Sequence, residues 1–145
     1  MPSVEPGADL RRVVLGSRAP HRAAAWYRRA LGLADTDPDA DSVTSRNRGD
    51  EVLQAGDVEL LITYRSHVAT AAVEPNRLVL NFVVDDILEV EARLVAMEAI
   101  WVRELERTTC GIIGTVVDLD GNLVQIIEPA GRTWPWQAES TEEHP

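Results

Sequence analysis

Val13-Val14-Leu15-Gly16-Ser17 runs into a helical stretch that ends at Leu31-Gly32-Leu33, and the chain later repeats this pattern. Leu80-Asn81-Phe82-Val83-Val84 leads in the same way into a second helical stretch, residues 87–97. A shift of 67 residues, which places Val13 on Leu80, superimposes the two copies. A period this long, with a strand, a helix and further strands in each copy, predicts two tandem βαβ-like modules.

Each copy continues into a strong apolar strand, Val58–Tyr64 in the first and Leu123–Ile127 in the second. Two short strands, near 42–46 and 51–54, are expected before the first of these. The sequence therefore predicts a single domain at 10–131, built of modules at 10–65 and 77–131, with flexible termini at 1–9 and 132–145.

Turn and capping residues mark where the elements end. Pro20 suits the first turn of a helix, and Gly32 suits its termination. Asp120-Gly121 followed by Asn122 is a strong hairpin-turn signal. Residues 34–41 and the polar stretch 106–110 are expected to be loops.

Composition restricts the classes of partner. The net charge of −10 over 145 residues argues against a nucleic-acid partner, since phosphate binding needs a basic face. No apolar run approaches the roughly 20 residues of a membrane span, so no membrane partner is expected and a cytoplasmic location is the default. The one cysteine, Cys110, excludes an internal disulfide, and we expect it to be a small packed residue rather than a reactive thiol.

Alternation along the strong strands separates two faces of each sheet. One parity is wholly apolar and should lie under the helices. The other parity is mixed, which is what a sheet curled around a polar cavity would show, although an ordinary solvent-facing surface is the alternative. We predict an α+β fold in which the two βαβββ modules form one open, eight-stranded, barrel-like cleft with the helices outside. The polar members of the mixed face are Arg12, Glu59, Thr63, Asn81 and Gln125.

Two motifs resemble a known family. Trp26-Tyr27-Arg28-Arg29-Ala30-Leu31-Gly32-Leu33 is similar to its helix motif, an aromatic-Tyr pair leading to Leu-Gly-Leu. Asp118-Leu119-Asp120-Gly121-Asn122, followed by an apolar strand, is similar to its C-terminal motif. Both are typical of the vicinal-oxygen-chelate superfamily, which holds glyoxalase I, bleomycin-resistance proteins and extradiol dioxygenases. The resemblance implies the fold over about 10–131 and a homodimer, but no single activity.

The resemblance also implies four positions for a metal ion, one on the first strand and one on the last strand of each module. They fall on Arg12, on Glu59 or Leu61, on Val79 and on Gln125. Arginine and valine cannot ligate a cation, and a divalent ion needs roughly three or more protein donors. We therefore expect no metal and no other cofactor.

Three functions remain open for the polar residues. The first is a metal-free protein that binds, and possibly sequesters, a drug or metabolite, with Arg12 as a fixed cation for the ligand. The second is a metal-independent isomerase or lyase that acts on a small carbonyl compound, with Glu59 as general base. The third is a metal-dependent lyase or dioxygenase, if the ligand positions are misaligned. An internal Arg12–Glu59 pair with only a structural role is the alternative to a ligand-binding arginine.

The remaining aromatic and histidine residues carry no assigned chemistry. Trp134 and Trp136 are expected to pack down the C-terminal tail. His21, His67 and His144 are expected on the surface, so no catalytic dyad or triad can be read from the sequence. The identity of the ligand does not follow from these residues.

Overall fold

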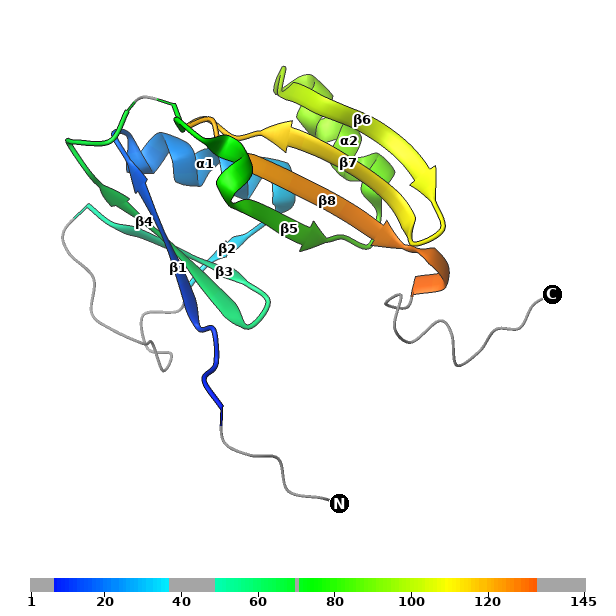
Figure 1. The fold of residues 1–145 in the computed structure, drawn as a ribbon, viewed down its shortest axis with the longest axis horizontal. Coiled ribbons are helices and arrows are strands. Elements are labelled where there is room, and N and C mark those ends of the chain that lie inside the picture. Colours follow the sequence, from blue (N-terminus) through cyan, green and yellow to red (C-terminus); the bar gives the residue numbers. More distant parts are fainter. Residues whose placement is uncertain (1–6, 37–48, 70, 133–145) are drawn as a thin grey trace. The chain divides into compact units, whose positions relative to one another are not determined.

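A computed structural model of the chain describes residues 7–36, 49–69 and 71–132, which form two compact units dividing at Val68 and Ala69 (Figure 1). The predicted strand at 42–46, the tail tryptophans Trp134 and Trp136, and His144 lie outside the described residues. In the part of the chain that is described, no helix is long and apolar enough to cross a membrane.

The first unit holds a four-stranded sheet and most of one helix. Its elements are β1 (Arg12–Ser17), α1 (Pro20–Leu31), β2 (Ala34–Asp35), β3 (Glu51–Ala55) and β4 (Val58–Tyr64). The strand order is β1-β4-β3-β2, and β1 runs parallel to β4 while the other neighbours are antiparallel.

The second unit repeats this arrangement. Its elements are the short 3-10 helix η1 (Pro75–Arg77), β5 (Val79–Val83), α2 (Ile87–Ala96), β6 (Ile100–Thr108), β7 (Gly111–Val117), β8 (Leu123–Pro129) and η2 (Ala130–Arg132). The strand order is β5-β8-β7-β6, and β5 runs parallel to β8. The α+β class and the two tandem βαβββ modules are confirmed, because both units have the same order and the same parallel pair.

Two segments that the sequence predicted to be loops are partly strand. Ala34 and Asp35 form the short strand β2 because they pair with Gln54 and Leu53 of β3. β6 extends to Thr108, so most of the predicted loop at 106–110 is strand. In both segments the strand structure comes from pairing, with β3 in the first case and across the β6–β7 turn in the second, which local composition does not encode.

The predicted helix ends are confirmed by their capping geometry. α1 begins at Pro20 in its first turn, and Gly32 ends it in the left-handed region, with φ 69°, donating to the carbonyl of Arg28 at 2.9 Å. α2 begins after Asp86, whose side chain accepts from the backbone N–H of Glu89 at 3.2 Å.

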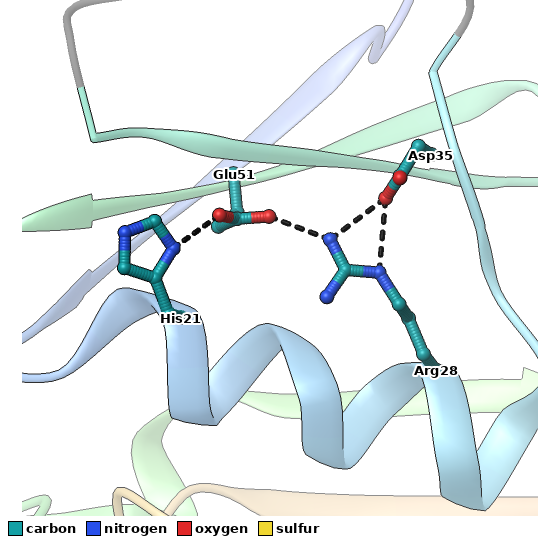
Figure 2. A network of polar contacts seen from close by, with 4 residues as sticks. All are labelled: His21, Arg28, Asp35 and Glu51. Carbon is teal, nitrogen blue, oxygen red and sulfur yellow. Dashed lines mark hydrogen bonds and ion pairs between the residues drawn. The ribbon is translucent and has the colours of Figure 1, made fainter.

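Polar contacts of α1 identify the sheet face that it covers. Figure 2 shows His21 and Arg28 of α1 reaching Glu51 of β3, while Arg28 also reaches Asp35 of β2. Glu51 lies beside Ile62 of β4, so the two share a face. The helix therefore covers the predicted apolar face. The hydrogen bond to Asp35 is the main cause of a raised pKa for Arg28, so this contact favours its charged form.

The second unit shows the same division of faces. The backbone N–H of Ile87, at the start of α2, donates to the side chain of Glu128 at 2.9 Å. Glu128 has the parity of Val124 and Ile126, which pair with Leu80 and Phe82 of β5. These residues thus lie on the helix-covered face, as the alternation predicted.

Truncations on opposite faces of β8 should differ in cost. Val124 is fully buried on the helix-covered face, so Val124→Ala is expected to lower the free energy of unfolding by about 2 kcal/mol. Gln125, the next residue, faces the other way and is half-buried, so Gln125→Ala is expected to cost under ~1 kcal/mol. Urea denaturation measures both values. Equal losses would show that the face assignment is wrong.

Candidate functional site

The face of the first sheet opposite α1 carries a row of polar and apolar side chains. We call it the unit-1 polar face. Its register is fixed by β1–β4 pairing, which sets each residue of β1 beside one of β4. The pairs are Arg12 with Glu59, Val14 with Leu61, and Gly16 with Thr63.

Arg12 and Glu59 form a buried ion pair on this face. Nε and Nη2 of Arg12 donate to the same oxygen, Oε1 of Glu59, at 3.0 and 2.6 Å. The side chains are only 10% and 8% exposed. The strand register makes this pair, because the two residues are direct neighbours in the parallel ladder. Two charges at this depth stabilise each other against desolvation.

The middle of the unit-1 polar face is apolar and open. Val14 is 46% exposed, and its neighbours Leu61 and Thr63 are half-buried. A partly exposed apolar pair beside a buried ion pair offers contact area together with a fixed polar group, which is the usual composition of a small-molecule site.

Arg65 extends this face by one residue beyond β4, and the sequence reasoning missed it. Its backbone N–H donates to the carbonyl of Ser17 at 3.0 Å, so the ladder with β1 continues past Tyr64. Every second residue of β4 lies on this face, namely Glu59, Leu61 and Thr63. Arg65 is the next residue in this series. Extending the period-2 pattern by one position would have identified it.

Gly16 makes room for the Arg65 side chain. A Cβ atom at Gly16 would lie 2.8 Å from Cγ of Arg65 and 3.3 Å from Cγ1 of Val68. Gly16 does not have a positive φ, so space rather than backbone conformation accounts for the glycine. Glycine inside a strand marks such a close approach.

The other two predicted site residues belong to the second unit. Asn81 of β5 and Gln125 of β8 are direct neighbours in the parallel ladder and lie on the face opposite α2. Asn81 is exposed and Gln125 half-buried. The five predicted residues thus form two groups, Arg12 with Glu59 and Thr63 in one unit, and Asn81 with Gln125 in the other.

The strand pairing decides which residue of β4 corresponds to Gln125. Gln125 pairs with Asn81, and the repeat places Asn81 on Val14. Because Val14 pairs with Leu61, the counterpart of Gln125 is Leu61 and not Glu59. The four positions implied for a metal are therefore Arg12, Leu61, Val79 and Gln125. Only Gln125 carries a ligating atom, so these residues do not fit a metal ion.

The reactive side chains elsewhere do not join this face. His21 is exposed and bonded to Glu51 on the helix side, and His67 is exposed in the segment after β4. Cys110 is exposed in the β6–β7 turn, so the expectation of a packed thiol is wrong. Thr108 pairs directly with Gly111, so Cys110 lies in the short turn that joins β6 to β7 rather than in the core. Within the described ranges, no three His, Cys, Asp or Glu residues group as a metal site would require.

The C-terminal motif has a structural role in the β7–β8 turn. The Asp118 carboxylate accepts from the backbone N–H groups of Asp120 and Asn122 at 2.8 and 2.9 Å, and from the Asn122 amide at 3.0 Å. Gly121 has φ 84°, a conformation that favours glycine.

The helix motif is also structural. Trp26 and Tyr27 are buried with their rings edge to face, and the ring centroids are 4.9 Å apart. Both motifs therefore build the fold.

Residues 12–127 match the family model of the glyoxalase-like domain. The chain belongs to the glyoxalase-like domain family. The match spans both modules of this glyoxalase-like domain, and the resemblance to the vicinal-oxygen-chelate superfamily is confirmed. The curated proteins contain no match to the sequence.

Solved structures resemble this glyoxalase-like domain over most of its length. TioX from Micromonospora sp. ML1 is 22% identical with a TM-score of 0.61, over 84% of this chain and 99% of its own. TnmS3, an antibiotic binding protein from Streptomyces sp. CB03234, is 18% identical with a TM-score of 0.63, over 87% and 99%. Lactoylglutathione lyase from Agrobacterium tumefaciens is 20% identical with a TM-score of 0.60, over 90% and 99%. At these identities the similarity shows the fold.

Proposed function

We propose that this glyoxalase-like domain is a metal-free small-molecule-binding protein that sequesters a drug or metabolite against the unit-1 polar face. The observation that carries the proposal is the Arg12–Glu59 pair, which occupies a position where the superfamily places a metal ligand. A buried ion pair beside the partly exposed Val14–Leu61 surface gives a ligand a fixed polar anchor and an apolar platform.

The antibiotic-binding description of TnmS3 supports this proposal, since that protein has a similar fold. Lactoylglutathione lyase also shares the fold, so the fold alone does not choose between binding and catalysis. Asn81 and Gln125, which pair with each other in the second unit, stay predicted ligand-binding residues. The homodimer, the domain boundaries 10–131 and the cytoplasmic location stay predictions.

The Arg12–Glu59 geometry does not favour Glu59 as a general base. Oε1 of Glu59 already accepts two hydrogen bonds from the Arg12 guanidinium, and the Glu59 side chain is only 8% exposed, so this oxygen is not open to a substrate. A general base must take up a proton during the reaction. Turnover of a carbonyl substrate that Glu59→Gln abolishes would favour the isomerase or lyase alternative.

Metal removal should leave the protein unchanged. One donor among the four implied positions is too few to hold a divalent ion, so the purified protein is expected to contain well under one equivalent of zinc, nickel, manganese or iron. EDTA treatment should leave the melting temperature and ligand binding as they were. Elemental analysis and a thermal melt measure these outcomes. One equivalent of metal whose removal abolishes binding would contradict the proposal.

Binding itself can be tested by methyl NMR on protein treated with EDTA. Bleomycin and a panel of aromatic antibiotics and aromatic carboxylates are added in turn, and the methyl shifts of Val14 and Leu61 are followed. A ligand of the unit-1 polar face should shift these methyls and leave the neighbouring Val13 and Leu60, which face α1, in place. Shifts confined to Val13 and Leu60 would place binding on the wrong face.

A further inference from the structure

We infer that Arg65 is the anion-recognising residue of the unit-1 polar face, and that the ligand is an elongated apolar or aromatic molecule carrying a carboxylate or similar anionic group. This inference rests on the proposed function, because it names the class of ligand for the same face. Three features of the described residues support it: the placement of Arg65, the carboxylates near each arginine, and the surface between Arg65 and Arg12.

Arg65 is held in place by its backbone and by the space above Gly16. Its N–H donates to Ser17 at 3.0 Å, and its carbonyl accepts from Val68 at 3.5 Å in a turn that folds back over the end of β1. Its Cγ lies over Gly16, where an added Cβ would come within 2.8 Å. The stem of the side chain is thus packed on the face, and a packed stem reduces the entropy lost when the guanidinium binds a ligand.

The two arginines of this face differ in their charge environment. Arg12 is paired with Glu59 and contributes no net charge to its end of the face. Arg65 is exposed and has no carboxylate partner among the residues that the structure describes. The uncompensated positive charge therefore lies at the Gly16 end. An arginine in this state favours a carboxylate, which its planar fork can bind through two hydrogen bonds.

The surface between the two arginines fits an apolar ligand body. Gly16 lies four positions after Arg12 along extended chain, or ~13 Å at about 3.3 Å per residue. Val14 and Leu61 lie side by side in this interval, and Thr63 adds a hydroxyl next to Gly16. A molecule that covers Val14 and Leu61 would place one end near Arg65 and the other near the Arg12–Glu59 pair.

A matched pair of probes separates the charge from the apolar contact. Biphenyl-4-carboxylate and biphenyl-4-carboxamide have nearly the same shape, but only the first is an anion. Affinities are measured by titration at 0.15 M salt, where the Debye length of about 8 Å screens the net negative charge of the chain. We expect wild-type protein to bind the carboxylate about tenfold more tightly than the carboxamide, as one charge-assisted interaction allows.

Substitutions then assign this preference to Arg65. Arg65→Gln should bring the ratio of the two affinities to about one, whereas Arg65→Lys should keep part of it, since lysine retains the charge but not the fork. Gly16→Ala should reduce the ratio, because the added Cβ displaces the Arg65 stem. Arg22→Gln is the matched control: it removes the same charge from an exposed position on α1 and should leave the ratio tenfold.

The outcomes distinguish this inference from the function on which it rests. If both probes shift the Val14 and Leu61 methyls with equal affinity in wild-type protein, the face binds small molecules but the inference about Arg65 is wrong. A preference that survives Arg65→Gln also overturns the inference. If neither probe shifts these methyls, the proposed binding face and the role of Arg65 are both wrong.

Discussion

Arg12→Ala is expected to lower the free energy of unfolding by about 3–5 kcal/mol, because it leaves the Glu59 carboxylate buried without its cation. The Glu59 side chain is only 8% exposed and accepts two hydrogen bonds from Arg12. Water cannot fully replace these contacts at that depth. Urea denaturation followed by far-UV circular dichroism measures the change.

A double variant distinguishes the cost of leaving Glu59 without Arg12 from the net contribution of the Arg12–Glu59 pair to stability. Arg12→Met combined with Glu59→Leu removes both charges and leaves apolar side chains of similar size. Because replacing both members of a buried pair is often close to neutral, the double variant should lie within ~1 kcal/mol of wild type. A double variant that loses the sum of both single losses would show that the two residues do not act as a pair.

Gly111→Ala is expected to cost roughly 4 kcal/mol or more, because two effects add at this position. Gly111 has φ 139°, in a region that other residues rarely adopt. An added Cβ would overlap the carbonyl oxygen of Glu128 and lie 2.9 Å from the N–H nitrogen of Ala130. Both are backbone atoms, one in β8 and one at the start of η2, so no side-chain rotation relieves the overlap. A thermal or urea melt measures the loss.

Gly56→Ala provides the control for backbone conformation alone. Gly56 also has a positive φ, 59°, but nothing lies within 4 Å of its added Cβ. This substitution should therefore cost only about 1 kcal/mol. Similar losses at Gly56 and Gly111 would mean that the close approach of β7 and β8 at Gly111 is not the dominant effect.

The faces of both sheets could be predicted from the sequence because every second residue of each strong strand is apolar. Leu60, Ile62, Val124 and Ile126 belong to this set and are all buried, and a slip of one residue would move every one of them to the opposite face. The helix ends were also predictable, since Pro20 and Gly32 act through local backbone geometry. Arg12, Glu59 and Thr63 were placed on one face by the same alternation.

Features that depend on pairing between distant segments could not be predicted in this way. The choice between Glu59 and Leu61 as the counterpart of Gln125 needed the register of two parallel pairs. Arg65 lies beyond the apolar run, and its position follows from the bond to Ser17 rather than from its own composition. Exposure of Cys110 follows from the tight β6–β7 turn, which a preference of cysteine for interiors does not reveal.

The parallel pairing of β1 with β4 has a consequence for the speed of folding. Arg12 and Glu59 are 47 positions apart, and closing a loop of that length costs about 3 kcal/mol of chain entropy. The β3–β4 hairpin closes over far fewer residues, so β1 joins a sheet that is already started, and the unit-1 polar face is completed late. A ligand that bound across β1 and β4, as proposed above, would therefore stabilise the contact that is expected to form last.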